Sequence, residues 1–130
     1  MTPDALSDRL WRFAARVGKA VDALLETRLG RHVAGQLVRC GTSASPNYDE
    51  GCAAESRADF VHKLGVALKE LRESRGWLRF IIISGLLPEK RILPLLSESE
   101  ELSNIIARSF PTAKSHRPAP EVARAGESSI

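Results

Sequence analysis

The feature that most constrains the fold of this chain is the regular spacing of its apolar residues. In residues 3–27 they recur at alternating intervals of four and three positions, at Leu6, Leu10, Phe13, Val17, Ala20 and Leu24. In residues 54–84 the same intervals connect Phe60, Leu64, Ala67, Leu71, Ser74, Leu78 and Ile81. Such spacing aligns side chains along one side of an α-helix. The sequence therefore predicts long amphipathic helices that bury these sides together.

Two further segments complete a set of four predicted helices. Gly30 should end the first helix or its turn, and the apolar positions of the second helix are Val33, Leu37, Cys40 and Ala44. The fourth starts after Pro88, which suits the first position of a helix, and Pro111 should end it. Pro94 lies within this last segment, so the helix either begins near Pro94 or kinks there.

Four helical segments with short connections predict an all-α protein, folded as an antiparallel up-down four-helix bundle. A chain of 130 residues forms one domain by length, and the bundle should occupy residues 1–111. Residues 112–130 are rich in Ala, Ser, Pro and charge, with little to bury. We therefore expect them to form a flexible C-terminal tail.

The helical pattern breaks within residues 36–51, around Pro46. A proline lacks the backbone donor and clashes with the carbonyl four residues earlier, so Pro46 should kink or stop the helix. We expect Asn47 to be largely buried and, with Ser43, to hydrogen-bond backbone groups that Pro46 leaves unpaired. The small residues here let another backbone come close. The predicted polar kink comprises Ser43, Pro46, Asn47, Glu50 and Gly51.

This stretch, with its small residues, its Asn and its Glu-Gly pair, resembles the signature of the four helix bundle protein family. That family includes proteins encoded in intervening sequences of large-subunit ribosomal RNA genes. Accessory variability determinants of diversity-generating retroelements look like relatives. The resemblance continues through residues 56–65, 67–74 and 77–78 and covers about residues 6–110. It implies a ring-like homopentamer, and for the retroelement relatives a basic barrel that partners a reverse transcriptase and its RNA.

Basic residues form a stripe along the first predicted helix. Arg9, Arg12, Arg16 and Lys19 recur at helical spacing, and Arg28, Arg31 and Arg39 lie on or near the next helix. One interpretation is a solvated helix face, which is what most charge stripes are. The other is a surface that contacts the phosphates of a nucleic acid. The formal net charge of +3 permits this binding without demanding it.

The end of the third predicted helix is apolar on nearly every side, because residues 77–83 contain few polar positions. A helix of this kind is buried by its own core or by a neighbouring subunit. We expect a homo-oligomer, with five subunits the number that the resemblance implies. The residues predicted at its interface are Trp11, Trp77, Phe80, Ile81 and Ile83.

Residue patterns that carry catalysis or metal binding are weak in this chain. Asp59 and His62 are spaced like the carboxylate–histidine pairs of di-iron bundles, but neither of the other two histidines belongs to such a pair. Cys40 and Ser43 have no base arranged near them in sequence. We therefore expect no metal, no cofactor and no enzymatic activity.

Several features bear on location and role. No apolar run reaches the length of a membrane span, and the first residues lack the apolar core of a signal peptide. Cys40 and Cys52 are not at zinc-ligand spacing, and we expect reduced thiols in the cytoplasm. The sequence favours a non-catalytic cytoplasmic scaffold or adaptor that binds nucleic acid, as RNA or an RNA–protein complex, through basic helix faces. A protein–protein interaction module with no nucleic-acid role remains the alternative.

Overall fold

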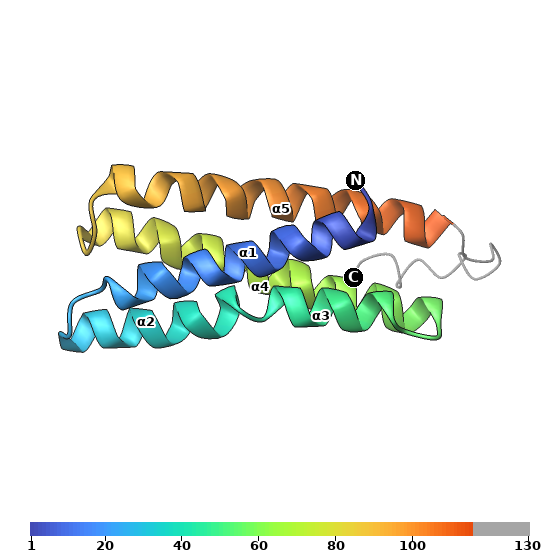
Figure 1. Cartoon of the computed structure of the whole chain (residues 1–130), viewed down its shortest axis with the longest axis horizontal. Coiled ribbons are helices and arrows are strands. Elements are labelled where there is room, and N and C mark those ends of the chain that lie inside the picture. The colour runs from blue at the N-terminus through green and yellow to red at the C-terminus, as the bar shows by residue number, and fades with distance from the viewer. Residues whose placement is uncertain (116–130) are drawn as a thin grey trace, which may run out of the picture.

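A computed structural model describes the backbone of residues 1–115 and the side chains of residues 1–110. The chain forms five helices in this range: α1 (Pro3–Asp22), α2 (Arg28–Gly41), α3 (Ala44–Cys52), α4 (Arg57–Ser84) and α5 (Glu89–Ser115). Helices α2 and α3 follow one another along the same line and together make one arm of the molecule (Figure 1). The five helices therefore build four arms.

The four arms run antiparallel, and each arm packs against its two neighbours. Helix α1 contacts α2 and α3 on one side and α5 on the other, while α4 contacts the same helices from across the bundle. The chain reverses direction at each of the three connections between arms (Figure 1). The predicted antiparallel four-helix bundle is confirmed.

Local signals explain where the helices begin. Thr2, Thr27 and Ser56 precede α1, α2 and α4, and each side-chain oxygen accepts a hydrogen bond from a backbone N–H three residues later, at 3.0–3.1 Å. These bonds satisfy N–H groups that have no partner within the helix. Because these three helices each follow a capping residue, their arms start at defined positions.

The turn from α4 to α5 is set by one glycine. Gly85 has a φ of 73°, in the left-handed region that a residue with a Cβ avoids. The Gly85 N–H donates to the Ile82 carbonyl and the Leu86 N–H to the Ile81 carbonyl, both at 3.1 Å. This pair of bonds satisfies the last carbonyls of α4 and reverses the chain.

The predicted apolar sides of the helices meet in one core. Its fully buried side chains come from every arm of the bundle and include Leu10, Phe13, Val17, Val33, Leu37, Leu64, Leu71, Leu78, Ile92, Leu102 and Ile106. Spacings of three and four positions recur within each arm, because each helix presents one side to the centre. Burying this much apolar surface is the main force that holds the arms together.

The break between α2 and α3 lies at Thr42 and Ser43, upstream of Pro46. Pro46 is the third residue of α3, a position where no N–H is needed within the helix, so the helix resumes through it. The Asn47 amide donates to the Ser43 carbonyl at 2.8 Å and to the Ser43 hydroxyl at 3.2 Å. Asn47 is half-buried rather than largely buried, because only one side of this turn is covered.

Three helix boundaries differ from those predicted. The first helix ends at Asp22, because residues 23–27 form the connection to α2, and Gly30 is the third residue of α2 rather than the end of the first helix or its turn. Helix α4 begins at Arg57 after its Ser56 cap. Helix α5 passes through Pro94 and continues through Pro111 to Ser115. Core packing on both sides of Pro94 holds the helix, with Ile92 before it and Leu102 after it. Pro111 therefore does not end the fourth arm.

Two further sequence expectations concern the C-terminal tail and membrane spans. Of the predicted tail, residues 112–115 belong to α5, and residues 116–130 lie outside the described residues. Among the helices formed by residues 1–115, none combines the length and the apolar character that crossing a membrane requires.

Candidate nucleic-acid interface

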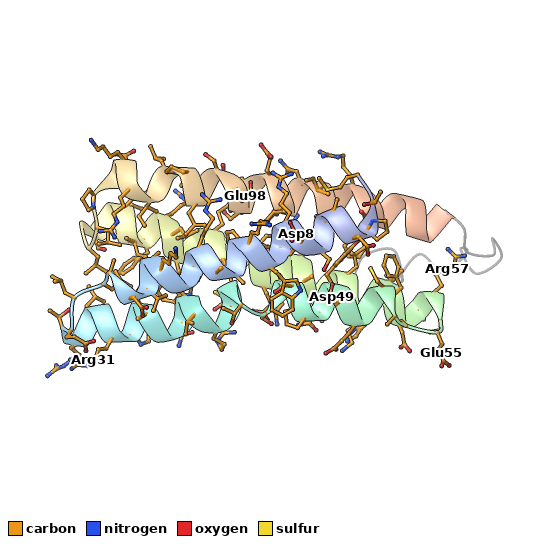
Figure 2. The ribbon with its side chains drawn as sticks, viewed as in Figure 1. Asp8, Arg31, Asp49, Glu55, Arg57 and Glu98 are labelled. Atoms are coloured by element: carbon orange, nitrogen blue, oxygen red, sulfur yellow. The ribbon has the colours of Figure 1, made fainter. Side chains whose placement is uncertain are left out.

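Arg9, the first residue of the predicted basic stripe, is neutralised by α5. Its guanidinium donates to both carboxylate oxygens of Glu98, at 2.7 and 2.8 Å, and also to Glu101. Figure 2 shows Glu98 on the side of α5 that borders α1. The hydrogen bonds to Glu98 and then to Glu101 raise the pKa of Arg9 above its ordinary value. Arg9 therefore joins two arms and is not free to contact a phosphate.

Arg39 is neutralised in the same way on another side of the bundle. The Arg39 guanidinium donates to Glu70 at 3.4 Å and to Glu73, and these two bonds connect α2 to α4. It also donates to Gln36 on its own helix at 3.2 Å. Glu70 is buried, so its charge needs this partner. Arg39 is thus part of the packing between arms.

Three predicted contact residues lie on the surface. Arg12 forms an ion pair with Asp8 at 2.7 Å, one turn away on α1, and both side chains are exposed. Exposed pairs of this kind contribute little and exchange readily with other partners. Arg31 donates to the Glu26 carbonyl at 2.8 Å, and Arg28 is exposed at the start of α2.

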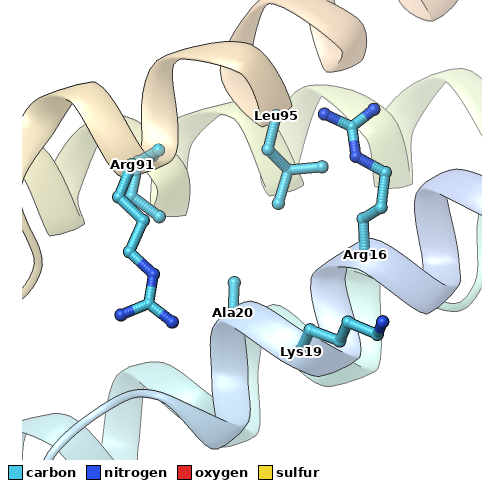
Figure 3. A pocket seen from close by; sticks show the side chains of 6 residues that line it. Arg16, Lys19, Ala20, Arg91 and Leu95 are labelled. Carbon is cyan, nitrogen blue, oxygen red and sulfur yellow. The ribbon is translucent and has the colours of Figure 1, made fainter.

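Arg16 and Lys19 line a cleft of about 180 Å³ between α1 and α5, and Arg91 of α5 stands on its opposite side (Figure 3). The remaining lining residues are Ala20, Ile92 and Leu95. No carboxylate lines this cationic cleft, and within the described residues no ion pair engages any of its three cations. The cleft therefore concentrates uncompensated positive charge over an apolar floor, which is an arrangement suited to an anion.

Arg91 was absent from the predicted set of contact residues. It faces Arg16 and Lys19 only because α1 and α5 pack antiparallel, although the two helices are far apart in the sequence. One local signal was available, because Lys90 and Arg91 follow Glu89 in the first turn of α5. Cations are disfavoured at that end of a helix, so a basic pair there indicates a role other than helix stability.

Two acidic residues of α3, Asp49 and the kink residue Glu50, contact the two neighbouring arms. The Asp49 carboxylate accepts a hydrogen bond from the Ser7 hydroxyl at 2.6 Å and from the Trp11 indole N–H at 2.8 Å (Figure 2). On the other side, Lys63 of α4 forms an ion pair with Glu50 at 2.7 Å. These side chains clamp α3 between α1 and α4, which is a structural role.

Gly51 provides the close approach expected of a small residue in the kink. A Cβ at this position would lie 3.0 Å from the Cβ of Lys63 and 3.6 Å from Phe60. Helix α3 therefore packs against α4 with almost no side chain between them at this point.

The residues predicted at an oligomer interface differ widely in exposure. Ile83 is 74% exposed and Trp11 is 47% exposed, even though the Trp11 indole N–H has a partner. Ile81 is fully buried in the core of its own chain, so it cannot form part of a surface. Two positions along a helix turn a side chain by about 200°, which separates Ile81 from Ile83.

Trp77 and Phe80 are half-buried and form a small aromatic cluster. The Trp77 ring packs edge-on against Phe80 and against His32 of α2, with ring centroids 5.8 Å apart in both pairs. The His32–Trp77 pair stabilises the contact between α2 and α4, while Trp77 and Phe80 lie one turn apart on α4. Part of the surface of each ring is thus buried within its own chain.

Groups that could perform chemistry are either exposed singly or buried. Asp59 and His62 are exposed on α4, and within the described residues no three His, Cys, Asp or Glu side chains are placed to hold a metal ion. Cys40 is buried, and burial raises the pKa of its thiol. Burial and then a hydrogen bond with Cys52 raise the pKa of Tyr48. Both groups therefore stay protonated at neutral pH.

The described residues form an antiparallel four-helix bundle with a cationic cleft between α1 and α5. The chain matches the model of the 23S rRNA-intervening sequence protein family over residues 9–108, and it belongs to that family. It is similar to a crystal structure of a protein of unknown function from the S23 ribosomal protein family of Bacteroides thetaiotaomicron. The two chains are 28% identical, with a TM-score of 0.76, over 81% of this chain and 97% of the other. No curated protein matches the chain.

Proposed function

We propose that this protein is a non-catalytic adaptor of the cytoplasm that binds RNA through the cationic cleft. The observation that carries the proposal is the convergence of Arg16, Lys19 and Arg91 on a cleft without a carboxylate. The family name connects its members with intervening sequences of 23S ribosomal RNA, which is why RNA is the nucleic acid proposed.

Binding by this route acts on phosphates and tolerates different sequences. Phosphate contacts position a nucleic acid but carry no direct sequence information. Three contacts to a single strand would make the logarithm of affinity fall with the logarithm of salt at a slope of about 2. Arg12 and Arg28, both exposed, would extend the surface along α1 and onto α2. Arg9 and Arg39 stay outside it because their charges are neutralised.

A binding measurement at several salt concentrations tests the proposal. The variant Arg16→Gln/Lys19→Gln/Arg91→Gln removes the cleft cations and lowers the formal net charge from +3 to 0. It should bind a structured RNA at least about tenfold more weakly than wild type and with a flatter salt dependence.

A matched control separates the cleft from overall charge. The variant Arg72→Gln/Arg79→Gln/Arg108→Gln also removes three exposed cations, so its formal net charge is again 0. It should keep most of the wild-type affinity. Equal losses in the two variants would contradict the cleft as the binding site, and a wild type that leaves RNA unshifted at low salt would overturn the proposed function.

A second candidate function is a protein-interaction module that assembles with copies of itself. The observation in its favour is the exposure of large apolar side chains, with Ile83 at 74% and Leu25 at 62%. Ile83 lies in the last turn of α4 and Leu25 lies in the α1–α2 connection, and these two regions are at the same end of the bundle (Figure 1). A ring-like homopentamer is the assembly proposed from the family resemblance. It is compatible with RNA binding, because a ring repeats each weak cleft several times.

A further inference from the structure

The charges along the seam between α1 and α5 divide into two groups. At one place the seam is balanced, because Arg9 of α1 is paired with Glu98 and Glu101 of α5. About two turns further along α1, cations of both helices face one another across the cleft, at Arg16, Lys19 and Arg91. The same two helices thus carry both a neutralised contact and an uncompensated one.

Facing cations disfavour the packed state unless an anion lies between them. Like charges on neighbouring elements repel, and here the floor of Ala20, Ile92 and Leu95 excludes part of the water that would screen them. Local conflicts of this kind concentrate at functional sites. A bound anion would remove the repulsion and connect α1 to α5.

The start of α5 adds to the positive potential of the cleft. Arg91 and Ile92 are the third and fourth residues of α5, so the cleft borders the end of the helix that carries a partial positive charge. The first residue, Glu89, is exposed and does not line the cleft. Phosphates are the anions most often bound where side-chain cations and a helix N-terminus meet.

The number of cations indicates which kind of phosphate fits. A phosphodiester inside an RNA strand carries one negative charge, whereas a phosphate monoester carries between about 1.5 and 2 at neutral pH and has three acceptor oxygens. The three cationic side chains of the cleft match the three acceptor oxygens of a phosphate monoester better than the two free oxygens of a phosphodiester. The end of a strand can also enter a cleft of about 180 Å³ more easily than an internal phosphate, because the RNA chain does not have to pass through the cleft and out again.

We propose that the cationic cleft binds a phosphate monoester, presented by the end of an RNA strand. This inference rests on the proposed RNA-binding function and deepens it by naming the group that the cleft recognises. Arg16 and Lys19 would contact the phosphate from α1, and Arg91 would contact it from α5. The internal phosphates of the strand would then follow the exposed surface with weaker and less selective contacts.

Three single-stranded RNAs of identical sequence test the proposal, one with a 5′-phosphate, one with a 3′-phosphate and one with hydroxyls at both ends. Fluorescence anisotropy should show at least one phosphorylated strand bound about tenfold more tightly than the hydroxyl strand, as one added charged contact allows. The two phosphorylated strands show which end is recognised. In Arg91→Gln the ratio of the two affinities should fall to nearly one, while Arg79→Gln, an exposed cation of α4 outside the cleft, should retain the preference.

A thermal melt without RNA provides a readout that does not depend on strand binding. At low salt, Arg91→Gln should melt at or above the wild-type temperature, because one facing cation is gone. Added inorganic phosphate should raise the melting temperature of wild type but not that of Arg91→Gln. A destabilised Arg91→Gln, or an equal phosphate effect on both proteins, would contradict the anion site.

The outcomes for this inference and for the proposed function are distinct. Equal binding of all three strands, weakened equally by Arg91→Gln, would overturn the monoester preference and leave RNA binding by the cleft standing. Failure of every strand to bind would overturn the proposed function, and the RNA strand end as ligand with it. A phosphate-dependent rise in wild-type melting temperature would then still support the cleft as a phosphate site.

Discussion

At the scale of single residues, glycines decide how closely the arms approach. Gly41, the last residue of α2, is buried, and a Cβ built on it would lie 2.6 Å from a methyl group of Val17. Val17 is fully buried and branched at its Cβ, so it has no room to move aside. Gly35, on the exposed side of the same helix, has no neighbour within 4 Å of such a Cβ.

Gly41→Ala and Gly35→Ala should therefore have opposite effects on stability. The first forces α1 and α2 apart and should lower the free energy of unfolding by about 1–3 kcal/mol. The second removes a flexible residue from a helix interior and should raise that free energy by about 0.5–1 kcal/mol. Urea denaturation measures both, and a Gly41→Ala protein as stable as wild type would show that the α1–α2 contact is looser than described.

At the scale of elements, α5 shows that packing outweighs a local preference. Pro94 is the sixth residue of the helix, where its missing N–H leaves the Lys90 carbonyl without its usual partner. The helix persists because Ile92, Leu102 and Ile106 bury their side chains against the other arms. The burial of these side chains therefore offsets the free-energy cost of the proline.

Pro94→Ala should recover part of that cost. The exposed alanine restores the backbone donor and should raise the free energy of unfolding by about 1 kcal/mol or more, within the limit of about 3 kcal/mol for proline against alanine. Pro88→Ala is the control, because Pro88 precedes the helix and should change stability little. A destabilised Pro94→Ala, measured in the same urea titration, would mean that the proline shapes a bend that the bundle needs.

At the scale of the whole molecule, two strongly exposed apolar side chains lie at one end of the bundle, and three cations without a carboxylate face one another along the α1–α5 seam. Ile83 and Leu25 contribute to the first region, and Arg16 and Arg91 contribute to the second. Ile83 is 74% exposed, and together with Leu25 at the same end of the bundle it marks the surface that we propose for contact with another subunit. Assembly through this end would leave the cleft available for RNA.

Light scattering on the purified protein should show a discrete oligomer, with five subunits expected from the family resemblance. Ile83→Glu places a charge in the contact and should shift the protein toward monomer, because burying an unpaired carboxylate is costly. The exposed residue Ala15 of α1 provides the control, since Ala15→Glu lies outside the apolar end and should leave the mass unchanged. A wild-type monomer at micromolar concentration would rule out this assembly.

The sequence by itself determined the helices, the bundle and the end of α4. Apolar spacing and capping residues act over one or two turns, so their consequences can be predicted from residues close together in the chain, such as Ser56 with Asp59 or Gly85 with Ile82. The family resemblance also predicted the four-helix bundle. The same local rules failed at Pro94 and Pro111, where the helix continues.

Only the tertiary structure decided which charged and apolar residues remain available. Arg9 and Arg16 belong to one predicted stripe, yet Arg9 is paired with Glu98, 89 positions away, and Arg16 faces Arg91 instead. Likewise, Ile81 lies in the core while Ile83 reaches solvent. These outcomes depend on how the arms are aligned against one another. That alignment follows from packing the whole core at once, and no short stretch of sequence encodes it.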